Sequence, residues 1–226
     1  MPLVFRYIEP MDVGIVCTGG LGPEKELVAS LLSRTEDPDR IFVVAADSGL
    51  LLCREYGLTP HLFVGDLDSL PDRSVLHAFP RTEVRIFPRD KDYTDTELAI
   101  EALRERGVHR WFLLGGGGGR ADQFLGIVSL CMRDFHPEVW LTHREEIRVL
   151  REGCRYRIDV QRGDVISLFP LSCGRCRAVT RGLRWPLDSL EWRPGDMGIS
   201  NEAVDDVVEV IVMEGRYLWV RNLAPV

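Results

Sequence analysis

Lysine is almost absent from this chain of 226 residues, because Lys25 and Lys91 supply all of it and arginine provides the other basic side chains. A basic surplus is absent too, since the formal net charge is −7. This balance argues against a protein whose main task is to neutralise a nucleic-acid backbone. Long apolar runs are also lacking, because stretches such as residues 41–46 have only the length of a strand. We therefore expect no membrane span and no membrane partner.

An uninterrupted apolar segment is missing at the start, where Glu9, Pro10 and Asp12 interrupt any signal peptide, and this favours a cytoplasmic location. The six cysteines are scattered rather than arranged as a disulfide framework, so we expect reduced thiols. Cys173 and Cys176 form a CxxC pair, but a second pair or two nearby histidines are lacking. A turn with two incidental thiols is therefore favoured over a metal or redox site.

Between residues 13 and 142, short apolar runs alternate with segments of helical spacing. The runs are VGIVC, IFVVAA, HLFVG, VRIF, RWFLLG and VWLT. Continuous apolar strands are typical of a mostly parallel sheet that is covered by helices on both faces. The clearest helix is predicted from Thr94 to Arg106, with Thr94 and Glu97 as a capping box and Gly107 at its end.

After about residue 150 the pattern changes to short β-rich runs separated by turns. These runs are CRYRIDV, DVISLF, AVTRGL, VVEVIVM and RYLWVR. We therefore predict an α/β fold with a Rossmann-like N-terminal domain over residues 1–145, followed by a small all-β sandwich domain over residues 146–226.

Acidic residues gather where the predicted strands end. They are Asp47, then Asp66 with Asp68, then Asp90, Asp92 and Asp95. Ligands bind at the carboxyl ends of strands in an open parallel sheet, so these carboxylates could converge on one crevice. Converging carboxylates are usually joined by a hard divalent ion such as Mg²⁺. In the sharpest cluster, GDLDSL, Ser69 adds a hydroxyl, although an exposed acidic turn is the simpler alternative.

A glycine-rich loop, LGGGGGRAD at residues 114–122, leaves one predicted strand and enters a helix. Backbone N–H groups at a helix N-terminus suit phosphate, and Arg120 would add a fixed cation. The loop matches no standard nucleotide motif, so a flexible surface loop is the alternative. Carboxylates for Mg²⁺, a glycine loop and an arginine together indicate phosphoryl transfer from a nucleotide, with the acceptor left open.

An ordered set of six motifs resembles the thiamine pyrophosphokinase family. The motifs are ADSG (46–49), GDLDS (65–69), KDYTDTELA (91–99), GGRADQ (118–123), GLRWPL (182–187) and ISNE (199–202). The resemblance implies a homodimer with active sites between subunits. It also implies Mg²⁺-dependent transfer of the pyrophosphoryl group of ATP to the hydroxyl of thiamine, which releases AMP.

The resemblance also assigns roles to individual residues. The expected metal ligands are Asp66, Asp68, Asp92 and Asp95, which with Arg120 form the expected catalytic set. The expected ATP contacts are Asp47, Ser69, Thr94, Gly118, Gly119, Arg120 and Asp122. Asp122 would fix the direction of Arg120 or help to hold the acceptor. No histidine is assigned as a base, and Asp92 or Asp95 would accept the proton late in the reaction.

Thiamine has two flat rings, so its site needs an aromatic or apolar face. By resemblance, Trp185 would stack on a ring, Ser200 and Asn201 would reach the pyrimidine or the phosphates, and Lys91 and Asp95 would contact substrate. From the residues alone, Trp185 reads as a core tryptophan and ISNE as a turn.

The sequence departs from the family pattern at Ser48, Leu50 and Leu51, where bulkier side chains could alter the fit of base or substrate. Two alternatives therefore stay open. One is a pyrophosphokinase for another hydroxyalkyl heterocycle, such as a pterin alcohol. The other is a non-catalytic nucleotide or thiamine sensor, which the complete acidic motifs disfavour.

Overall fold

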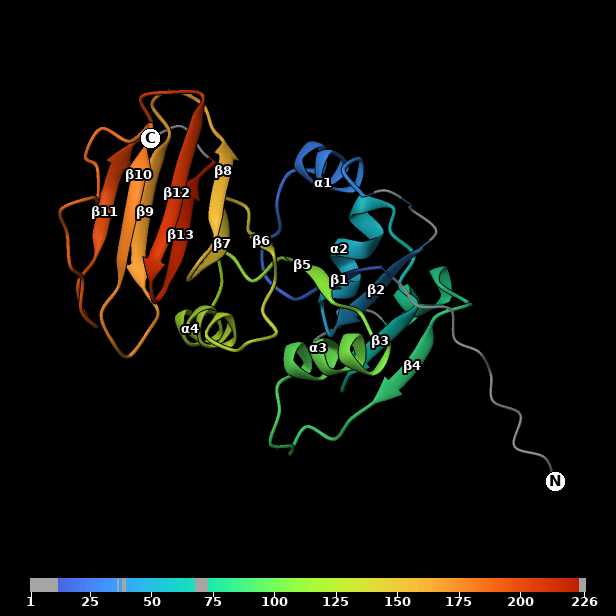
Figure 1. Ribbon diagram of the computed structural model, residues 1–226. Coiled ribbons are helices and arrows are strands. Elements are labelled where there is room, and N and C mark those ends of the chain that lie inside the picture. The colour runs from blue at the N-terminus through green and yellow to red at the C-terminus, as the bar shows by residue number, and fades with distance from the viewer. Residues whose placement is uncertain (1–11, 36, 38–39, 68–72, 224–226) are drawn as a thin grey trace. The chain divides into compact units, whose positions relative to one another are not determined.

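The computed structural model describes residues 12–35, 37, 40–67 and 73–223 (Figure 1). The chain divides into two compact units, Met1–Gly119 and Arg120–Val226. No helix in these described ranges is long and apolar enough to cross a membrane.

The first unit is built on parallel strands in the spatial order β5-β1-β2-β3-β4. Their bounds are Val13–Cys17 (β1), Ile41–Ala46 (β2), Leu62–Gly65 (β3), Glu83–Ile86 (β4) and Arg110–Leu114 (β5). Each lies within one residue of its predicted apolar run. Strands β1, β2 and β3 are buried along their whole length, as continuous apolar sequence predicts. Strand β4 departs from this expectation because it is an edge strand with exposed Val84 and Ile86.

Helices cover both faces of β1 in this unit. Their bounds are Lys25–Leu32 (α1), Gly49–Tyr56 (α2) and Asp95–Glu105 (α3), and a 3-10 helix spans Arg73–Ala78. A Cβ on Gly14 would lie 2.8 Å from the end of the Leu103 side chain of α3, so the glycine lets this helix pack closely on β1. The Cys17 thiol points to the opposite face and contacts Cys53 of α2.

Helix α3 forms as the sequence predicts. The Thr94 hydroxyl accepts from the Glu97 backbone N–H at 3.2 Å, and the Glu97 carboxylate accepts from the Thr94 N–H at 3.0 Å. This reciprocal capping box satisfies two N–H groups that a helix start leaves unpaired. The helix ends at the Arg106 cap, and Gly107 follows in the left-handed conformation with φ 71°.

The second unit contains helix α4 (Ala121–Cys131) and two groups of antiparallel strands. One group has the order β11-β9-β13-β7-β6, and the other has the order β10-β12-β8. The bounds are Val139–Leu141 (β6), Glu145–Arg151 (β7), Arg155–Asp159 (β8), Val165–Pro170 (β9), Arg177–Arg181 (β10), Gly198–Glu202 (β11), Val207–Glu214 (β12) and Arg216–Asn222 (β13).

Apolar side chains from both groups of strands share one core, as in a β-sandwich. Ile166, Leu168 and Trp219 come from the first group, and Val208 and Val210 come from the second; all are fully buried. Within this core, the rings of Trp192 and Tyr217 meet edge to face with centroids 5.5 Å apart.

Two strands lie close to the predicted domain boundary. VWLT, expected among the strands of the α/β domain, forms β6, which pairs antiparallel with β7. Residues 145–151 surround the predicted domain boundary, yet they form β7, which pairs with β13 along its whole length. An α/β part with helices and a small antiparallel β part are both present, as expected. The Rossmann-like description and the bounds 1–145 and 146–226 stay predictions.

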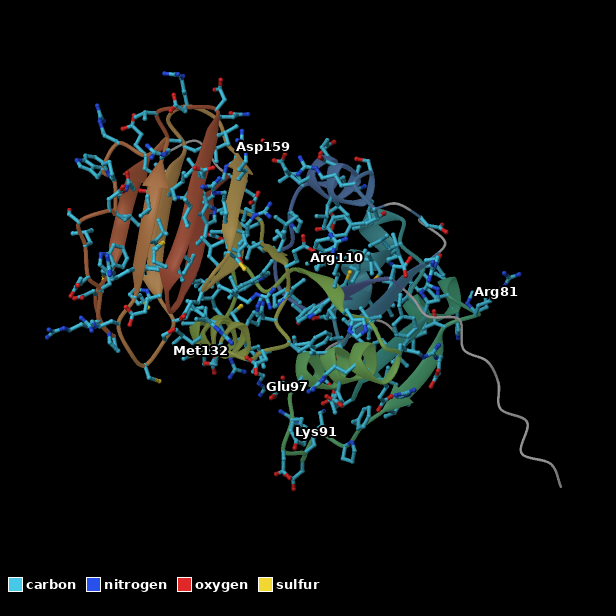
Figure 2. All side chains as sticks on the ribbon, in the orientation of Figure 1. Arg81, Lys91, Glu97, Arg110, Met132 and Asp159 are labelled. Atoms are coloured by element: carbon cyan, nitrogen blue, oxygen red, sulfur yellow. The ribbon has the colours of Figure 1, made fainter. Side chains whose placement is uncertain are left out.

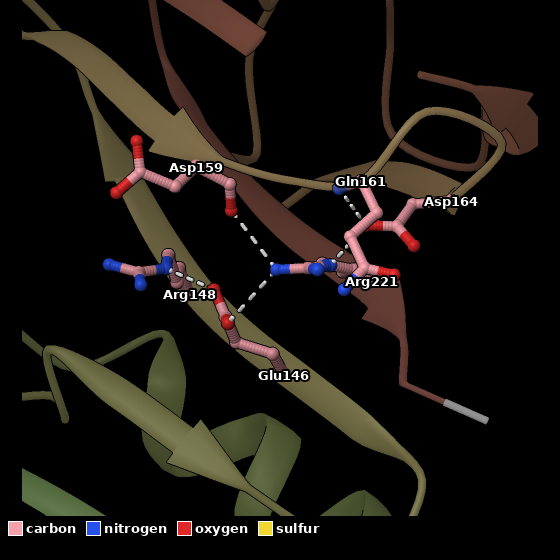
Figure 3. Close-up of polar contacts among 6 residues, drawn as sticks. All are labelled: Glu146, Arg148, Asp159, Gln161, Asp164 and Arg221. Carbon is pink, nitrogen blue, oxygen red and sulfur yellow. Dashed lines mark hydrogen bonds and ion pairs between the residues drawn. The ribbon is translucent and has the colours of Figure 1, made fainter. Parts of the chain in front are cut away.

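A network of ion pairs links β13, β7 and the β8–β9 turn in the second unit (Figure 3). Arg221 of β13 is largely buried and lies 2.7 Å from Asp164 and 3.7 Å from Glu146 of β7. Its guanidinium also donates to the Asp159 carbonyl of β8 at 3.0 Å. Asp164 in turn accepts from the backbone N–H of Gln161 at 2.7 Å. One arginine therefore joins strands from both groups.

Candidate functional site

The first unit places three carboxylates at one edge of its parallel sheet. Asp47 follows β2, Asp66 follows β3, and Asp95 opens α3. The charges of Asp47 and Asp66 both help to raise the pKa of Asp95, so the three groups lie within electrostatic reach of one another. The structure therefore brings these predicted site residues together at the strand ends.

Lys91 holds Asp95 in place. Its ammonium lies 3.2 Å from the Asp95 carboxylate and donates to the Pro88 carbonyl at 3.2 Å, on the loop labelled in Figure 2. Burial is the largest cause of the raised Asp95 pKa, and the Lys91 ion pair opposes it. This contact ties the predicted substrate residue Lys91 to the acidic edge.

Backbone strain falls on three of the predicted motifs. Within the described residues, the non-glycine positions with positive φ are Asp47 (53°), Leu67 (65°) and Ser200 (61°). They belong to ADSG, GDLDS and ISNE. Such conformations cost about 1–3 kcal/mol each and cluster at functional sites, where the surrounding structure enforces them.

The acidic edge has the donor chemistry of a site for a hard divalent cation. One carboxylate oxygen of Asp47 is buried without a hydrogen-bond partner in the described structure, and the buried oxygen of Asp95 faces the Lys91 ammonium. Oxygen donors of this kind suit Mg²⁺. Asp92 is exposed on the loop before α3, and Asp68 and Ser69 lie outside the described residues. Among the residues that are described, no three acidic, histidine or cysteine side chains form a ready metal site. The full ligand set therefore stays a prediction.

The first part of the glycine-rich loop pairs with the loop after β1. The N–H of Gly116 donates to Gly19 at 2.8 Å, and the N–H of Gly117 donates to Leu21 at 3.2 Å. A Cβ on Gly115 would lie 2.3 Å from the Thr18 carbonyl oxygen. The N–H groups of Gly116 and Gly117 are therefore engaged within the chain. Gly118 and Gly119, the predicted ATP contacts, follow this paired part.

Two threonines that the sequence reading missed join the loop after β1 to the start of α3, where Asp95 lies. The hydroxyls of Thr18, after β1, and Thr96, in the first turn of α3, are 2.7 Å apart. Thr18 is buried, and its signal in the sequence is a polar residue directly after an apolar strand. The predicted ATP contact Thr94 uses its hydroxyl in the helix cap described above, which gives it a structural task.

Arg120 and Asp122 form a two-contact ion pair at the start of α4, in the second unit. The guanidinium donates to the two carboxylate oxygens of Asp122 at 3.0 and 2.5 Å. The Arg120 side chain lowers the pKa of Asp122. Both side chains are exposed, and Asp122 sets the direction of the arginine.

The second unit contains an open pocket of about 580 Å³ that includes the predicted thiamine residues. Its lining is Trp185, Pro186, Leu187, Leu190, Glu191, Trp192, Asp196, Met197, Gly198, Ile199, Ser200 and Asn201. Trp185 is 56% exposed, so it is not a core tryptophan, whereas Trp140 and Trp219 are fully buried. An exposed indole that lines a pocket with both apolar and polar side chains is suited to a flat heterocycle with hydrogen-bonding groups.

Strand β11 is irregular where it lines this pocket. Its register with β9 shifts between Gly198 and Asn201, so that Ile199 and Ser200 are both exposed while Asn201 is buried. Bulges of this kind re-aim side chains beside binding sites. Asn201 lines the pocket, but its amide is engaged by its own chain, with Trp185 and Glu202 as partners.

The residues that depart from the family pattern fit locally. Leu50 is fully buried in the core of the first unit, and Leu51 is half-buried. The Ser48 hydroxyl would lie 2.4 Å from a Cβ on Gly19, so the neighbouring glycine makes room for it. The larger side chains at Ser48 and Leu50 are therefore accommodated within the unit.

Acidic strand ends in the α/β unit and a pocket with two tryptophans in the β unit are features expected of an enzyme that transfers a group from a nucleotide. Sequence profiles agree: the thiamin pyrophosphokinase catalytic domain matches residues 38–141, and the thiamin pyrophosphokinase vitamin B1 binding domain matches residues 155–216. The chain belongs to the thiamine pyrophosphokinase family.

Individual relatives share this assignment. A thiamine pyrophosphokinase of Bacillus subtilis (strain 168) is 25% identical over 211 residues, which cover 89% of this chain and 95% of the relative. The solved structure of a thiamin pyrophosphokinase from Geobacillus thermodenitrificans has a TM-score of 0.72 and 26% identity, with coverage of 95% and 98% of the two chains. That of Candida albicans has the same fold, with a TM-score of 0.74 at 16% identity and coverage of 94% and 89%.

Proposed function

We propose that this chain is a thiamine pyrophosphokinase, which transfers the pyrophosphoryl group of ATP to the hydroxyl of thiamine. The products are thiamine diphosphate and AMP. The observation that carries the proposal is the open pocket with the exposed Trp185, which lies in the part matched by the vitamin B1 binding domain. Leu50 is core and Gly19 makes room for Ser48, so the packing of these two residues supports no different acceptor.

In the proposed reaction the thiamine hydroxyl oxygen attacks the β-phosphorus of ATP. The bond from that phosphorus to the oxygen bridging to the α-phosphorus breaks, and AMP leaves with the bridging oxygen. Arg120, held by Asp122, balances negative charge on the phosphates, and the N–H groups of Gly118 and Gly119 contact them. The hydroxyl proton passes late to Asp92 or Asp95.

Mg²⁺ is the proposed metal, held by Asp66, Asp68, Asp92 and Asp95. When bound, it neutralises phosphate charge and orients the triphosphate. Lys91 keeps the Asp95 carboxylate in place, and Thr18 holds the helix that carries it through Thr96. Asp47, with an unpartnered buried oxygen, is proposed to contact the same metal-bound nucleotide.

A homodimer with active sites between subunits is proposed as the working assembly. Four large apolar side chains around the pocket are exposed in the single chain, namely Trp185, Leu190, Met197 and Ile199, and a second copy would cover part of them. Light scattering after gel filtration tests this, and a monomeric mass at assay concentration would contradict it. The cytoplasm is the proposed location, because free thiols suit a reducing compartment.

The activity is tested with purified protein, ATP, Mg²⁺ and thiamine, by following AMP and thiamine diphosphate chromatographically. We expect equal amounts of both products and their loss with EDTA. Pterin alcohols are run in parallel as acceptors. If neither product forms while thiamine or ATP still stabilises the protein against heat, the chain is a sensor. If a pterin alcohol reacts and thiamine does not, thiamine is not the acceptor.

A further inference from the structure

The motifs GLRWPL (182–187) and ISNE (199–202) contact each other through side chains of ISNE. Asn201 is only 7% exposed, and its amide bridges both backbone polar groups of Trp185. The carbonyl oxygen of the amide accepts from the Trp185 N–H at 3.1 Å, and the amide nitrogen donates to the Trp185 carbonyl at 2.7 Å. The same oxygen accepts from the Glu202 N–H at 2.9 Å. Both lone pairs of that oxygen are therefore used within the chain.

The next residue, Glu202, acts on the indole through Arg184. The Arg184 guanidinium donates to the Glu202 carboxylate at 2.5 Å, and the backbone N–H of Arg184 donates to the Glu202 carbonyl at 2.8 Å. The guanidinium carbon lies 5.5 Å from the centroid of the Trp185 ring, within the range of a cation–π contact. Glu202 thereby fixes the cation that rests against the tryptophan.

We propose that Asn201 and Glu202 are positioning residues that hold Trp185 in its binding orientation, Asn201 through the backbone and Glu202 through Arg184. This inference rests on the proposed function, because it takes Trp185 as the surface for the thiamine ring. It assigns Asn201 a different task from direct contact with the pyrimidine or the phosphates.

An exposed tryptophan needs such support. Trp185 is 56% exposed, so more than half of its surface is not held by surrounding protein. Ordering a mobile side chain upon binding costs affinity, and a site that is ordered beforehand avoids that cost. The β11 bulge makes the support local, because it turns Asn201 inward while Ile199 and Ser200 stay exposed.

The first test observes the tryptophan directly and needs no activity. The protein is labelled with 5-fluorotryptophan, and Trp185→Phe identifies the Trp185 signal in the fluorine NMR spectrum. Glu202→Gln keeps the side-chain shape but removes the charge that holds Arg184. Asn201→Asp keeps the accepting oxygen but places a second oxygen against the Trp185 carbonyl. We expect both variants to shift or broaden the Trp185 signal and to leave the signals of Trp111 and Trp140 unchanged.

The second test separates thiamine binding from turnover. We expect Glu202→Gln to raise the KM for thiamine about tenfold, as loss of one charge-assisted contact allows, with kcat and the KM for ATP changed less than about twofold. The matched control is Glu209→Gln, which removes a charge 3.8 Å from Arg155 in the same unit and outside the pocket. This control should leave the KM for thiamine and the Trp185 signal unchanged.

The inference fails if folded Glu202→Gln retains both the Trp185 signal and the thiamine KM of the parent protein. A KM that rises equally for thiamine and ATP would also contradict it. The arginine and glutamate side chains are both substantially exposed, so this variant should fold even if Asn201→Asp does not. If the parent protein makes no thiamine diphosphate, the proposed function fails, yet the fluorine spectra still decide whether Asn201 and Glu202 order Trp185.

Discussion

Asp95 combines burial, a lysine partner and two like charges, and this makes it the most informative single residue of the acidic edge. Its pKa is raised chiefly by burial, and the Lys91 ion pair keeps it from rising further. A carboxylate held in this way can bind a divalent cation, which attracts it more strongly than the single positive charge of lysine does.

We expect Asp95→Asn to fold normally and to lose turnover by about two orders of magnitude, because it removes one negative charge at nearly constant volume. The kcat and the melting temperature are measured together. Asp205→Asn, which breaks an exposed ion pair with Arg162, is the matched control and should keep full turnover. Unchanged turnover in folded Asp95→Asn would remove Asp95 from the mechanism.

Ser200 stores strain in the wall of the pocket, since it holds φ at 61° without being glycine. We expect Ser200→Gly to raise the free energy of unfolding by up to about 1 kcal/mol and also to raise the KM for thiamine, because the hydroxyl is lost. Ser200→Ala should raise the KM without the gain in stability. Chemical denaturation of both variants decides the matter, and a less stable Ser200→Gly would contradict the strain argument.

At the scale of elements, one arginine joins three strands of the second unit. Removing Arg221 would leave the largely buried Asp164 without its cation, while Glu146 would keep Arg148 at 2.6 Å. We expect Arg221→Ala to lower the free energy of unfolding by about 3 kcal/mol, as for a broken buried ion pair. Arg162→Ala removes an exposed partner of Asp205 and should cost less than about 0.5 kcal/mol. If urea denaturation shows the same loss of unfolding free energy in Arg221→Ala and Arg162→Ala, the network contributes no more to stability than an exposed ion pair.

Elements with one dominant pattern could be predicted from the sequence. Strands β1, β2 and β3 are continuous apolar runs, and α3 carries its own cap, so local chemistry and burial agree. Strand β11 could not be predicted, because ISNE contains a bulge and a positive φ that break the alternation of a strand. Strand β7 could not be predicted either, because its sequence lies where the pattern changes from strands alternating with helices to short β-rich runs.

The sequence predicts which residues belong to the site better than it predicts which residues contact each other there. Carboxylates after apolar strands mark a strand-end site by position alone, which applies to Asp47 and Asp66. The Thr18–Thr96 contact joins residues 78 apart, and the Asn201–Trp185 contact joins residues 16 apart. No local pattern encodes such pairs, because tertiary folding creates them.

For the whole molecule, two histidines with lowered pKa values predict how stability depends on pH. Burial lowers the pKa of His61 and of His136 below the ordinary value of 6.5. The His61 ring also accepts from the Val43 N–H at 3.1 Å, which requires a neutral nitrogen. The unfolded chain therefore binds more protons than the folded chain as the pH falls below 6.5, and stability must fall with it.

We expect the melting temperature to decrease from pH 7 to pH 5, a range that lies above the ordinary titration of most carboxylates. His61→Asn, which keeps an accepting atom near the ring nitrogen, should reduce this slope without abolishing it, because His136 remains. A slope that is the same in His61→Asn and in the parent protein would show that His61 does not contribute.

The central claim is the transfer of an intact pyrophosphoryl group to thiamine, and isotope labelling tests it most directly. ATP that carries oxygen-18 on the three terminal oxygens of its γ-phosphorus is incubated with the protein, Mg²⁺ and thiamine, and the products are analysed by mass spectrometry. We predict thiamine diphosphate that contains the complete label, together with unlabelled AMP. Labelled thiamine monophosphate with ADP, or unchanged thiamine, would contradict the proposed reaction.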